Sequence, residues 1–204
     1  GVVSNFLRKA STNHALLSVA CQALEEYDYI IIDSQGARHT FQESLIYASD
    51  LLITPVTPRY LDMTELVSGL LPRLSQLLPI RDGFPTISGR DFPELNVLIN
   101  MRRKNVTDQD QIENFLRTDF PEVVAKDYPR LNVNVLESVI YDRANFNKAL
   151  GQGVPAATLD RTDTSISIKE MMHSLILELF PEIQDELDDG ASTEKVQQQG
   201  GVNV

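Results

Sequence analysis

The sequence predicts an α/β protein with a mostly parallel sheet and helices on both faces, in three layers (α/β/α). The segment 29–32 is a short, continuous apolar run, which is typical of a strand buried on both faces, and apolar-rich segments at 51–56, 95–100 and 133–140 predict three further strands. Between these runs, apolar residues recur at helical spacing. Strands that alternate with helices in this way indicate a parallel sheet with right-handed crossovers.

The composition limits the class of protein. Its 204 residues are 42% hydrophobic, which is too apolar for a disordered chain. No apolar run approaches the ~18 residues that a membrane span needs. The one cysteine, Cys21, excludes an intramolecular disulfide and a cysteine-rich zinc site. A net charge of −11 argues against nucleic-acid binding by the whole surface, but not by a local basic cluster. We therefore expect a cytoplasmic globular protein.

The first part of the chain predicts two helices and two strands. Apolar residues at helical spacing predict a helix over 12–26, and the run at 29–32 predicts the first strand. This strand ends in a turn composition at 33–36. Helical spacing over 41–48 predicts a short helix, and the run at 51–56 predicts the second strand.

The middle of the chain predicts a long helix, a long loop and a third strand. Asp62 and Glu65 resemble a capping box that begins the helix. Pro72 falls inside the apolar stripe of this helix, so it should kink or divide it. Glycine and proline recur over 79–93, which predicts a loop longer than the usual α/β connection before the strand at 95–100.

The last part of the chain predicts a helix, a strand and two further helices. Thr107 and Asp110 are predicted to cap the first of these helices. The fourth strand at 133–140 precedes a short helix around Phe146 and Ala149. That helix should end at the glycine- and proline-containing segment 151–155.

The chain ends in a helix and an acidic tail. Apolar residues at helical spacing predict the final helix over 168–179. From about residue 184 the sequence becomes acidic and then rich in glutamine and glycine, which is typical of a solvated, disordered segment. We therefore predict a folded domain over 1–183 and a tail over 184–204.

Ligands of parallel α/β sheets bind at the carboxyl ends of the strands, so the residues there are candidates for a site. Asp33 follows the first strand and is suited to hold Mg²⁺ through water, or else only to cap a turn. Gly36 allows a phosphate oxygen to approach the backbone, or only eases the turn. Asn100 ends the third strand and could pair with a purine edge or satisfy a loop.

Basic residues follow the third and fourth strands. Arg102, Arg103 and Lys104 form a basic cluster that suits phosphate contacts, although three solvated charges in a loop are ordinary. Arg143 suits either a ligand contact or a surface ion pair.

Several segments, in order along the chain, resemble the ParA/Soj/MinD group of deviant Walker ATPases. Residues 27–36, Tyr-Asp-Tyr-Ile-Ile-Ile-Asp-Ser-Gln-Gly, resemble the switch II strand and loop of this group. Residues 48–56 are similar to the next strand of the family, and 98–100 to the strand that carries its purine-facing asparagine. Residues 142–149, followed by Gly-Val-Pro at 153–155, resemble a late segment of the family. Within this group, the Asp-Ser-Gln-Gly form resembles the ParA proteins of plasmid partition more than it resembles MinD.

The resemblance implies a P-loop NTPase-like fold and a Mg-ATP-dependent switch in plasmid or chromosome partition. ATP binding would drive homodimerisation, and a ParB-like centromere-binding partner would stimulate slow hydrolysis. Asp33 would hold the Mg²⁺ shell or position the attacking water, while Gln35 and Gly36 would sense the γ-phosphate. The residues implied on the adenine side are Asn100, Met101, Tyr141 and Arg143. Arg102, Arg103 and Lys104 would contact non-specific DNA.

The sequence departs from the family in one respect. The glycine-rich phosphate-binding loop with its lysines does not occur in these 204 residues. We expect this loop and its strand to precede Gly1, with the strand beside the 29–32 strand in the middle of the sheet. The chain would then be the carboxyl-terminal portion of a longer ParA-like protein.

Two other functions fit the residues. One is a non-enzymatic ParA-like scaffold, or protein-binding module, that lacks a phosphate loop. The other is a phosphoacceptor domain in which Asp33 is phosphorylated and Thr54 or Thr57, with Lys104, senses the phosphate. The second alternative calls for an acidic pair on an earlier strand, and only Glu25, Glu26 and Asp28 are acidic before Asp33.

Overall fold

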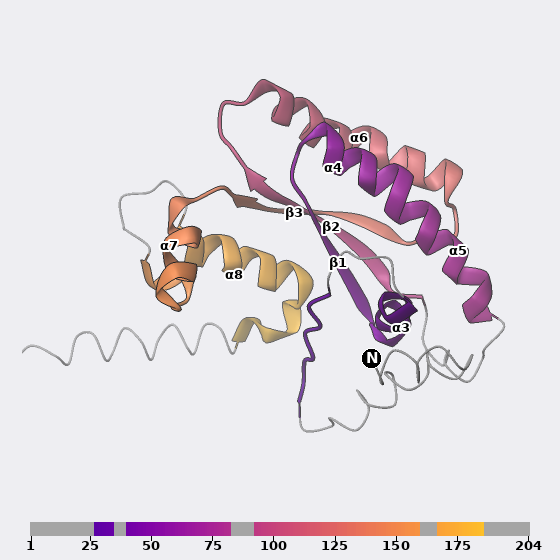
Figure 1. Ribbon diagram of the computed structural model, residues 1–204, viewed down its shortest axis with the longest axis horizontal. Helices are drawn as coiled ribbons and strands as arrows, with labels where there is room; N and C mark the ends of the chain where they lie inside the picture. Colours follow the sequence, from indigo (N-terminus) through magenta and orange to yellow (C-terminus); the bar gives the residue numbers. More distant parts are fainter. Residues whose placement is uncertain (1–26, 35–39, 83–91, 160–166, 186–204) are drawn as a thin grey trace, which may run out of the picture. The chain divides into compact units, whose positions relative to one another are not determined.

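The computed structural model describes residues 27–34, 40–82, 92–159 and 167–185. It is an α/β structure whose parallel sheet has the strand order β1-β2-β3 (Figure 1). β1 spans Leu51–Val56, β2 spans Glu94–Arg102 and β3 spans Val133–Tyr141. The predicted parallel α/β class is thus confirmed, and three of the four predicted strands are present.

The chain forms two compact units, and their boundary crosses β2 and β3. The first unit comprises the described residues up to Leu98 together with Asn105–Val135. The second comprises Ile99–Lys104 and the described residues from Leu136 onward. The amino-terminal halves of β2 and β3 therefore belong to the first unit, and their carboxyl ends belong to the second.

Helices of the first unit occupy most of the predicted positions. α3 spans Thr40–Ala48 and α6 spans Thr107–Asp127, both at segments whose helical spacing predicted them. Tyr47 of α3 donates a buried hydrogen bond to the carbonyl of Leu77, at 2.8 Å. The predicted helix over 12–26 lies outside the described residues.

The long helix after β1 has three parts. α4 spans Tyr60–Thr64, a π-helical segment η1 spans Glu65–Leu70, and α5 spans Leu71–Asp82. Pro72 is the second residue of α5, directly after the π-helical segment. Proline lacks an N–H donor and its ring collides with the carbonyl four residues earlier, so a wider turn accommodates it better than a regular one. The backbone stays helical through Leu71, so the change near Pro72 is one of hydrogen-bond pattern from π to α.

The predicted helix caps in the first unit are wrong. α4 follows Arg59 in an extended conformation without a side-chain cap, so Asp62 lies inside the first turn and forms no capping box. α6 follows Val106 in the same way, and Thr107 is its first helical residue. The N-cap position of each helix therefore lies before the predicted residue and carries a side chain, Arg59 or Val106, that forms no capping hydrogen bond. The predicted loop over 79–93 also starts later, since α5 continues to Asp82.

The strand predicted at 29–32 is wrong. This segment is described but forms no strand, and Ile31 is 94% exposed. An apolar run forms a strand only where another strand offers hydrogen bonds, because unpaired amides remain with water. Within the described part of the chain, the sheet comprises β1, β2 and β3 alone, so 29–32 has no partner strand there.

β1 and β2 differ in burial because of their places in the sheet. β2 is the central strand, and Leu95 to Ile99 are all buried, as predicted for a strand covered on both faces. β1 lies at an edge, and its Ile53 is 44% exposed. The prediction that β1 is equally buried is therefore wrong.

The second unit contains α7 at Ala144–Gln152, the 3₁₀ turns η2 at Ala156–Leu159 and η3 at Pro181–Ile183, and α8 at Ile168–Leu179. α7 ends at Gly153, whose φ of 64° is the left-handed conformation that glycine adopts at low cost. α8 begins with a capping box between Ser167 and Glu170. The two helices confirm the sequence predictions, but this capping box was not predicted.

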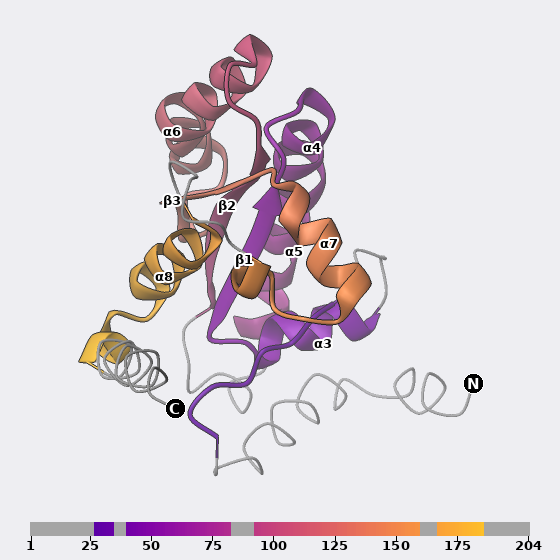
Figure 2. The ribbon, with the colours of Figure 1, turned by 90° about the vertical axis from the view of Figure 1, so that its left-hand side faces the viewer.

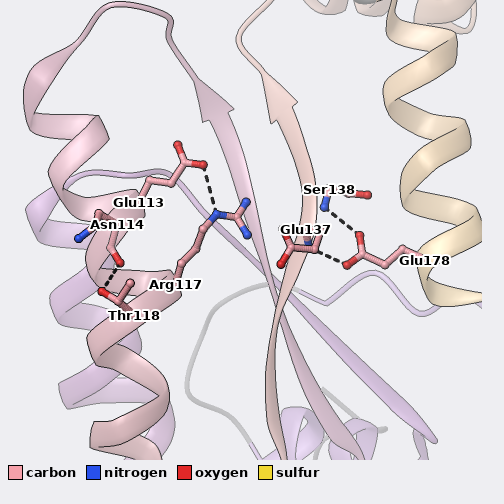
Figure 3. A network of polar contacts seen from close by, with 7 residues as sticks. All are labelled: Glu113, Asn114, Arg117, Thr118, Glu137, Ser138 and Glu178. Carbon is pink, nitrogen blue, oxygen red and sulfur yellow. Dashed lines mark hydrogen bonds and ion pairs between the residues drawn. The ribbon is translucent and has the colours of Figure 1, made fainter.

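The outer edge of β3 receives a carboxylate from α8 (Figure 3). The backbone amides of Glu137 and Ser138 donate to the two carboxylate oxygens of Glu178, at 2.6 and 2.8 Å. Unpaired edge amides invite pairing with another chain, and a side-chain acceptor blocks that pairing.

Within the ranges given above, no helix has both the length and the apolar surface needed to cross a bilayer.

Candidate functional site

The candidate site lies in the second unit, where β2 and β3 end. After Ile99 the chain continues through 100–104, and after Ile140 through 141–143, so both segments leave the same edge of the parallel sheet. The amide of Asp142 donates to the carbonyl of Arg102 at 2.9 Å, which fixes one segment against the other. The structure therefore brings together predicted residues at the carboxyl ends of β2 and β3 and just after them.

Asn100 and Met101 form a local backbone feature at this edge. The Met101 amide donates to Oδ1 of Asn100 at 2.9 Å. Met101 has a φ of 54°, the left-handed conformation that a non-glycine residue seldom adopts, and its side chain is 47% exposed. The bond to Oδ1 orients the Asn100 amide, and backbone strain of this kind is concentrated at functional sites.

The predicted basic cluster is divided between two environments. Arg102 is buried, and its guanidinium donates to the carbonyl of Arg103. Arg103 and Lys104 are exposed. Arg102 therefore supports the backbone of the site, while Arg103 and Lys104 are accessible to a ligand.

Two charge contacts join the segments after β2 and β3. Nε of Arg103 lies 2.7 Å from a carboxylate oxygen of Asp142. Nζ of Lys104 lies 5.7 Å from the centre of the Tyr141 ring, within the range of a cation–π contact. Arg143 occupies the N-cap position of α7 in an extended conformation. Four basic side chains against one carboxylate give this edge a positive field that suits an anionic ligand.

Asp142 is the site residue that the sequence analysis missed. Its amide and its carboxylate both link the two segments. Its position directly after the fourth predicted strand is the signal that could have identified it.

The residues predicted to act on phosphate do not belong to this cluster. Asp33 is exposed, belongs to the first unit and follows the segment that forms no strand. Gln35 and Gly36 lie outside the described residues. Among the residues that the structure does describe, no group of three or more histidine, cysteine, aspartate or glutamate side chains is placed to hold a metal ion.

The site brings together three kinds of chemical group. Asn100 offers amide groups for a base edge, Tyr141 offers an aromatic ring, and the cations offer charge for an anion. These groups suit a ligand that carries a hydrogen-bonding edge and negative charge, but the described residues do not by themselves fit Mg²⁺. Comparison of the sequence with protein-family models, with curated proteins and with solved structures gave no match.

Proposed function

We propose that this chain is the carboxyl-terminal portion of a ParA-like ATPase that acts in plasmid or chromosome partition in the cytoplasm. In this proposal, ATP binding drives homodimerisation, and hydrolysis stimulated by a ParB-like centromere-binding protein reverses it. The observation that carries the proposal is the convergence of Asn100 and Met101 with Tyr141 and Arg143 at the carboxyl ends of two parallel strands. This is where parallel α/β proteins bind nucleotides.

Exposed apolar side chains in the first unit also support the proposal. The Ile30, Ile31 and Ile32 side chains are 41%, 94% and 36% exposed, although their sequence is that of a buried strand. β1 ends the described sheet with Ile53 exposed. One further strand, beside both the 29–32 segment and β1, would bury both apolar surfaces. The proposal assigns this strand, and the phosphate-binding loop that follows it, to residues outside this sequence.

The proposal gives the described residues separate roles. Asn100 and Tyr141 face the adenine, and Met101 and Arg143 complete that side. Asp33 would supply a carboxylate for Mg²⁺ brought in with the nucleotide, because Mg²⁺ in such sites takes one or two carboxylates and otherwise phosphate and water. Gln35 and Gly36 sense the γ-phosphate, and the phosphate loop supplies the charge stabilisation of hydrolysis.

Non-specific DNA is a further proposed partner, through Arg103 and Lys104. Both side chains are exposed. Because Arg102 is buried, it is expected to act on DNA only through the backbone that it supports. The net charge of −11 restricts such binding to this edge.

The second candidate function is a non-enzymatic ParA-like scaffold. The observation that favours it is the absence of a glycine-rich loop with lysine from the 204 residues. The two candidates differ in the coding sequence upstream of Gly1. A glycine–lysine loop there favours the ATPase, and a start codon near Gly1 favours the scaffold.

The test is a titration of Mg-ATP, with turnover measured in parallel, on the chain extended to its natural upstream sequence. We expect binding and slow hydrolysis, with Asn100→Ala weakening ATP binding about tenfold through the lost base contact. Asp33→Ala should abolish hydrolysis without unfolding the protein. The control is Asn147→Ala, an exposed asparagine on α7. Normal turnover by Asp33→Ala would refute the role of Asp33, and equal effects of the two asparagine variants would refute the base site.

A further inference from the structure

α8 contacts β3 at two points along the strand. In both views the helix lies beside the part of β3 that belongs to the second unit (Figure 1, Figure 2). One contact is the Glu178 carboxylate on the strand amides, described above. The other lies about two helical turns earlier, where Sδ of Met171 accepts a hydrogen bond from the backbone amide of Tyr141 at 3.4 Å. α8 therefore holds β3 at Tyr141, the residue that ends the strand.

The bond from the Tyr141 amide to sulfur is shielded from water. Met171 is 4% exposed. A thioether is a weak acceptor, but water has little access to replace it at a side chain that is so deeply buried. Because a buried amide without an acceptor is unfavourable, this bond ties the position of the Tyr141 backbone to α8.

A second hydrogen bond holds the residue after Tyr141. The amide of Asp142 donates to the carbonyl of Arg102 at 2.9 Å. The Tyr141 ring lies 5.7 Å from Nζ of Lys104. Two successive amides thus bind partners on different segments of the chain, and together they determine where the backbone leaves β3 and where the Tyr141 ring lies.

A methionine on the apolar stripe of a helix ordinarily contributes packing alone. Met171 differs because its sulfur also accepts a bond from a backbone amide at the edge where β2 and β3 end. An aliphatic side chain of similar volume would keep the packing and lose the bond. The two roles can therefore be separated by substitution.

We propose that Met171 is a positioning residue of the site at the ends of β2 and β3. Its sulfur holds the backbone of Tyr141, so that the Tyr141 ring is presented to the bound base. The identity of that ligand rests on the function proposed above. The hold on Tyr141 does not need a ligand, so the two are measured separately.

The first measurement is hydrogen exchange of the Tyr141 amide in the 204-residue chain, resolved by residue. Met171→Leu keeps an apolar side chain of similar volume but removes the acceptor, and we expect the amide to exchange about ten times faster. Its proton signal should also move upfield, as for an amide that loses a hydrogen bond. The matched control is Met172→Leu, the same change at the neighbouring half-buried residue, which should leave this amide unchanged.

Norleucine, incorporated in place of methionine, is the second replacement. It keeps the unbranched shape of methionine and exchanges the sulfur for a methylene group, so the same change at the Tyr141 amide should occur even where the branch of leucine disturbs folding. Selenomethionine, which keeps an acceptor at this position, is its control and should leave the amide unchanged.

The second measurement is turnover of Mg-ATP by the chain extended to its natural upstream sequence. Because Tyr141 is proposed to contact the base and not the phosphates, Met171→Leu should raise KM about threefold and change kcat by less than about twofold. In the Tyr141→Ala background the same substitution should have no further effect, since it acts through the ring.

Three results would overturn the proposal. The first is unchanged exchange of the Tyr141 amide in both Met171→Leu and the norleucine protein. The second is an equal acceleration of that exchange by Met172→Leu. The third is that Met171→Leu raises KM as much without the Tyr141 ring as with it, which would assign Met171 to packing alone. An extended native chain that does not bind Mg-ATP would refute the proposed function, while the exchange measurement would still decide whether Met171 holds Tyr141.

Discussion

Met101 has a backbone conformation that its side chain does not favour. A φ of 54° raises the conformational free energy of an ordinary residue by about 1 kcal/mol, and that of a β-branched residue by more. Three variants therefore separate backbone strain from side-chain packing. Met101→Leu should retain the stability of the protein, and Met101→Val should be about 1 kcal/mol less stable than Met101→Leu. Met101→Gly should lie within about 1 kcal/mol of the parent, because relief of strain opposes the greater freedom of the unfolded chain.

Urea unfolding of the three variants measures these differences. Equal stabilities of the valine and leucine variants would show that the left-handed conformation is not maintained in solution. In the proposed site, this conformation serves base binding, because the Met101 amide orients the Asn100 side chain. The glycine variant should then bind ATP less tightly than the leucine variant even where their stabilities agree.

Single residues of the site were predictable only in part. Asn100 and Arg143 could be selected as candidates because they lie at or just after the ends of predicted strands, and strand ends meet at one edge of a parallel sheet. Tyr141 was selected only through the family resemblance. The ion pair of Arg103 with Asp142 joins residues 39 positions apart, so no local pattern contains it. The burial of Arg102 could not be predicted either, since a run of three basic residues is typical of a solvated surface.

The contact between α8 and β3 leads to a prediction at the scale of an element. Glu178→Ala removes the acceptor of the Glu137 and Ser138 amides. We expect these two amides to exchange hydrogen about ten times faster, and the protein to lose about 1 kcal/mol of stability because water replaces the carboxylate. Hydrogen exchange resolved by residue measures the effect.

A nearby acid provides the control for this change. Glu182→Ala removes an exposed carboxylate from η3, after the end of α8, and should leave both amides unchanged. Unchanged exchange in Glu178→Ala would mean that water already satisfies this edge of β3. Increased exchange with no loss of stability would mean that the carboxylate only protects the edge from other chains.

Elements were predictable where their pattern is local. Helical spacing located α3, α5, α6, α7 and α8, because burial of one helix face needs only a correct period of about 3.6 residues. Caps were less predictable, since Asp62 and Thr107 lie just inside their helices and the backbone before them starts the turn. The local sequence could not decide whether residues 29–32 form a strand. Its apolar run predicts burial, but pairing depends on another strand.

The exposed segment at 29–32 makes a second prediction for an element. Four large apolar side chains are exposed there (Tyr29, Ile30, Ile31 and Ile32), and the nearby Tyr27 is exposed as well. Such segments promote association between chains. Ile31→Lys should therefore reduce self-association of the 204-residue chain in sedimentation experiments. Its stability should not change, because the side chain is 94% exposed. Leu150→Lys, at a residue of α7 that is 84% exposed, is the control, and an equal effect there would show general charge repulsion instead.

At the scale of the whole molecule, the sheet order determines which strand is most stable. β2 is central and its residues Leu95 to Ile99 are buried, whereas β1 and β3 are edge strands of the described sheet. The Glu178 carboxylate accepts hydrogen bonds from amides of β3, whereas β1 is partly exposed to solvent at Ile53. We therefore expect hydrogen exchange to be slowest in β2 and fastest among the strands in β1.

Completion of the sheet would change this order of exchange rates among the strands. A measurement of that change tests the proposed architecture without any measurement of activity. If a strand from upstream residues pairs with both β1 and the 29–32 segment, their amides should become protected in the longer protein. β3 should change little, because it lies at the other end of the strand order. Exchange of the 204-residue chain and of the extended chain, compared under the same conditions, measures the difference. Protection that appears in β1 but not over 29–32 would place the added strand at the β1 edge alone. That result would leave Asp33 without the strand that is proposed to position it.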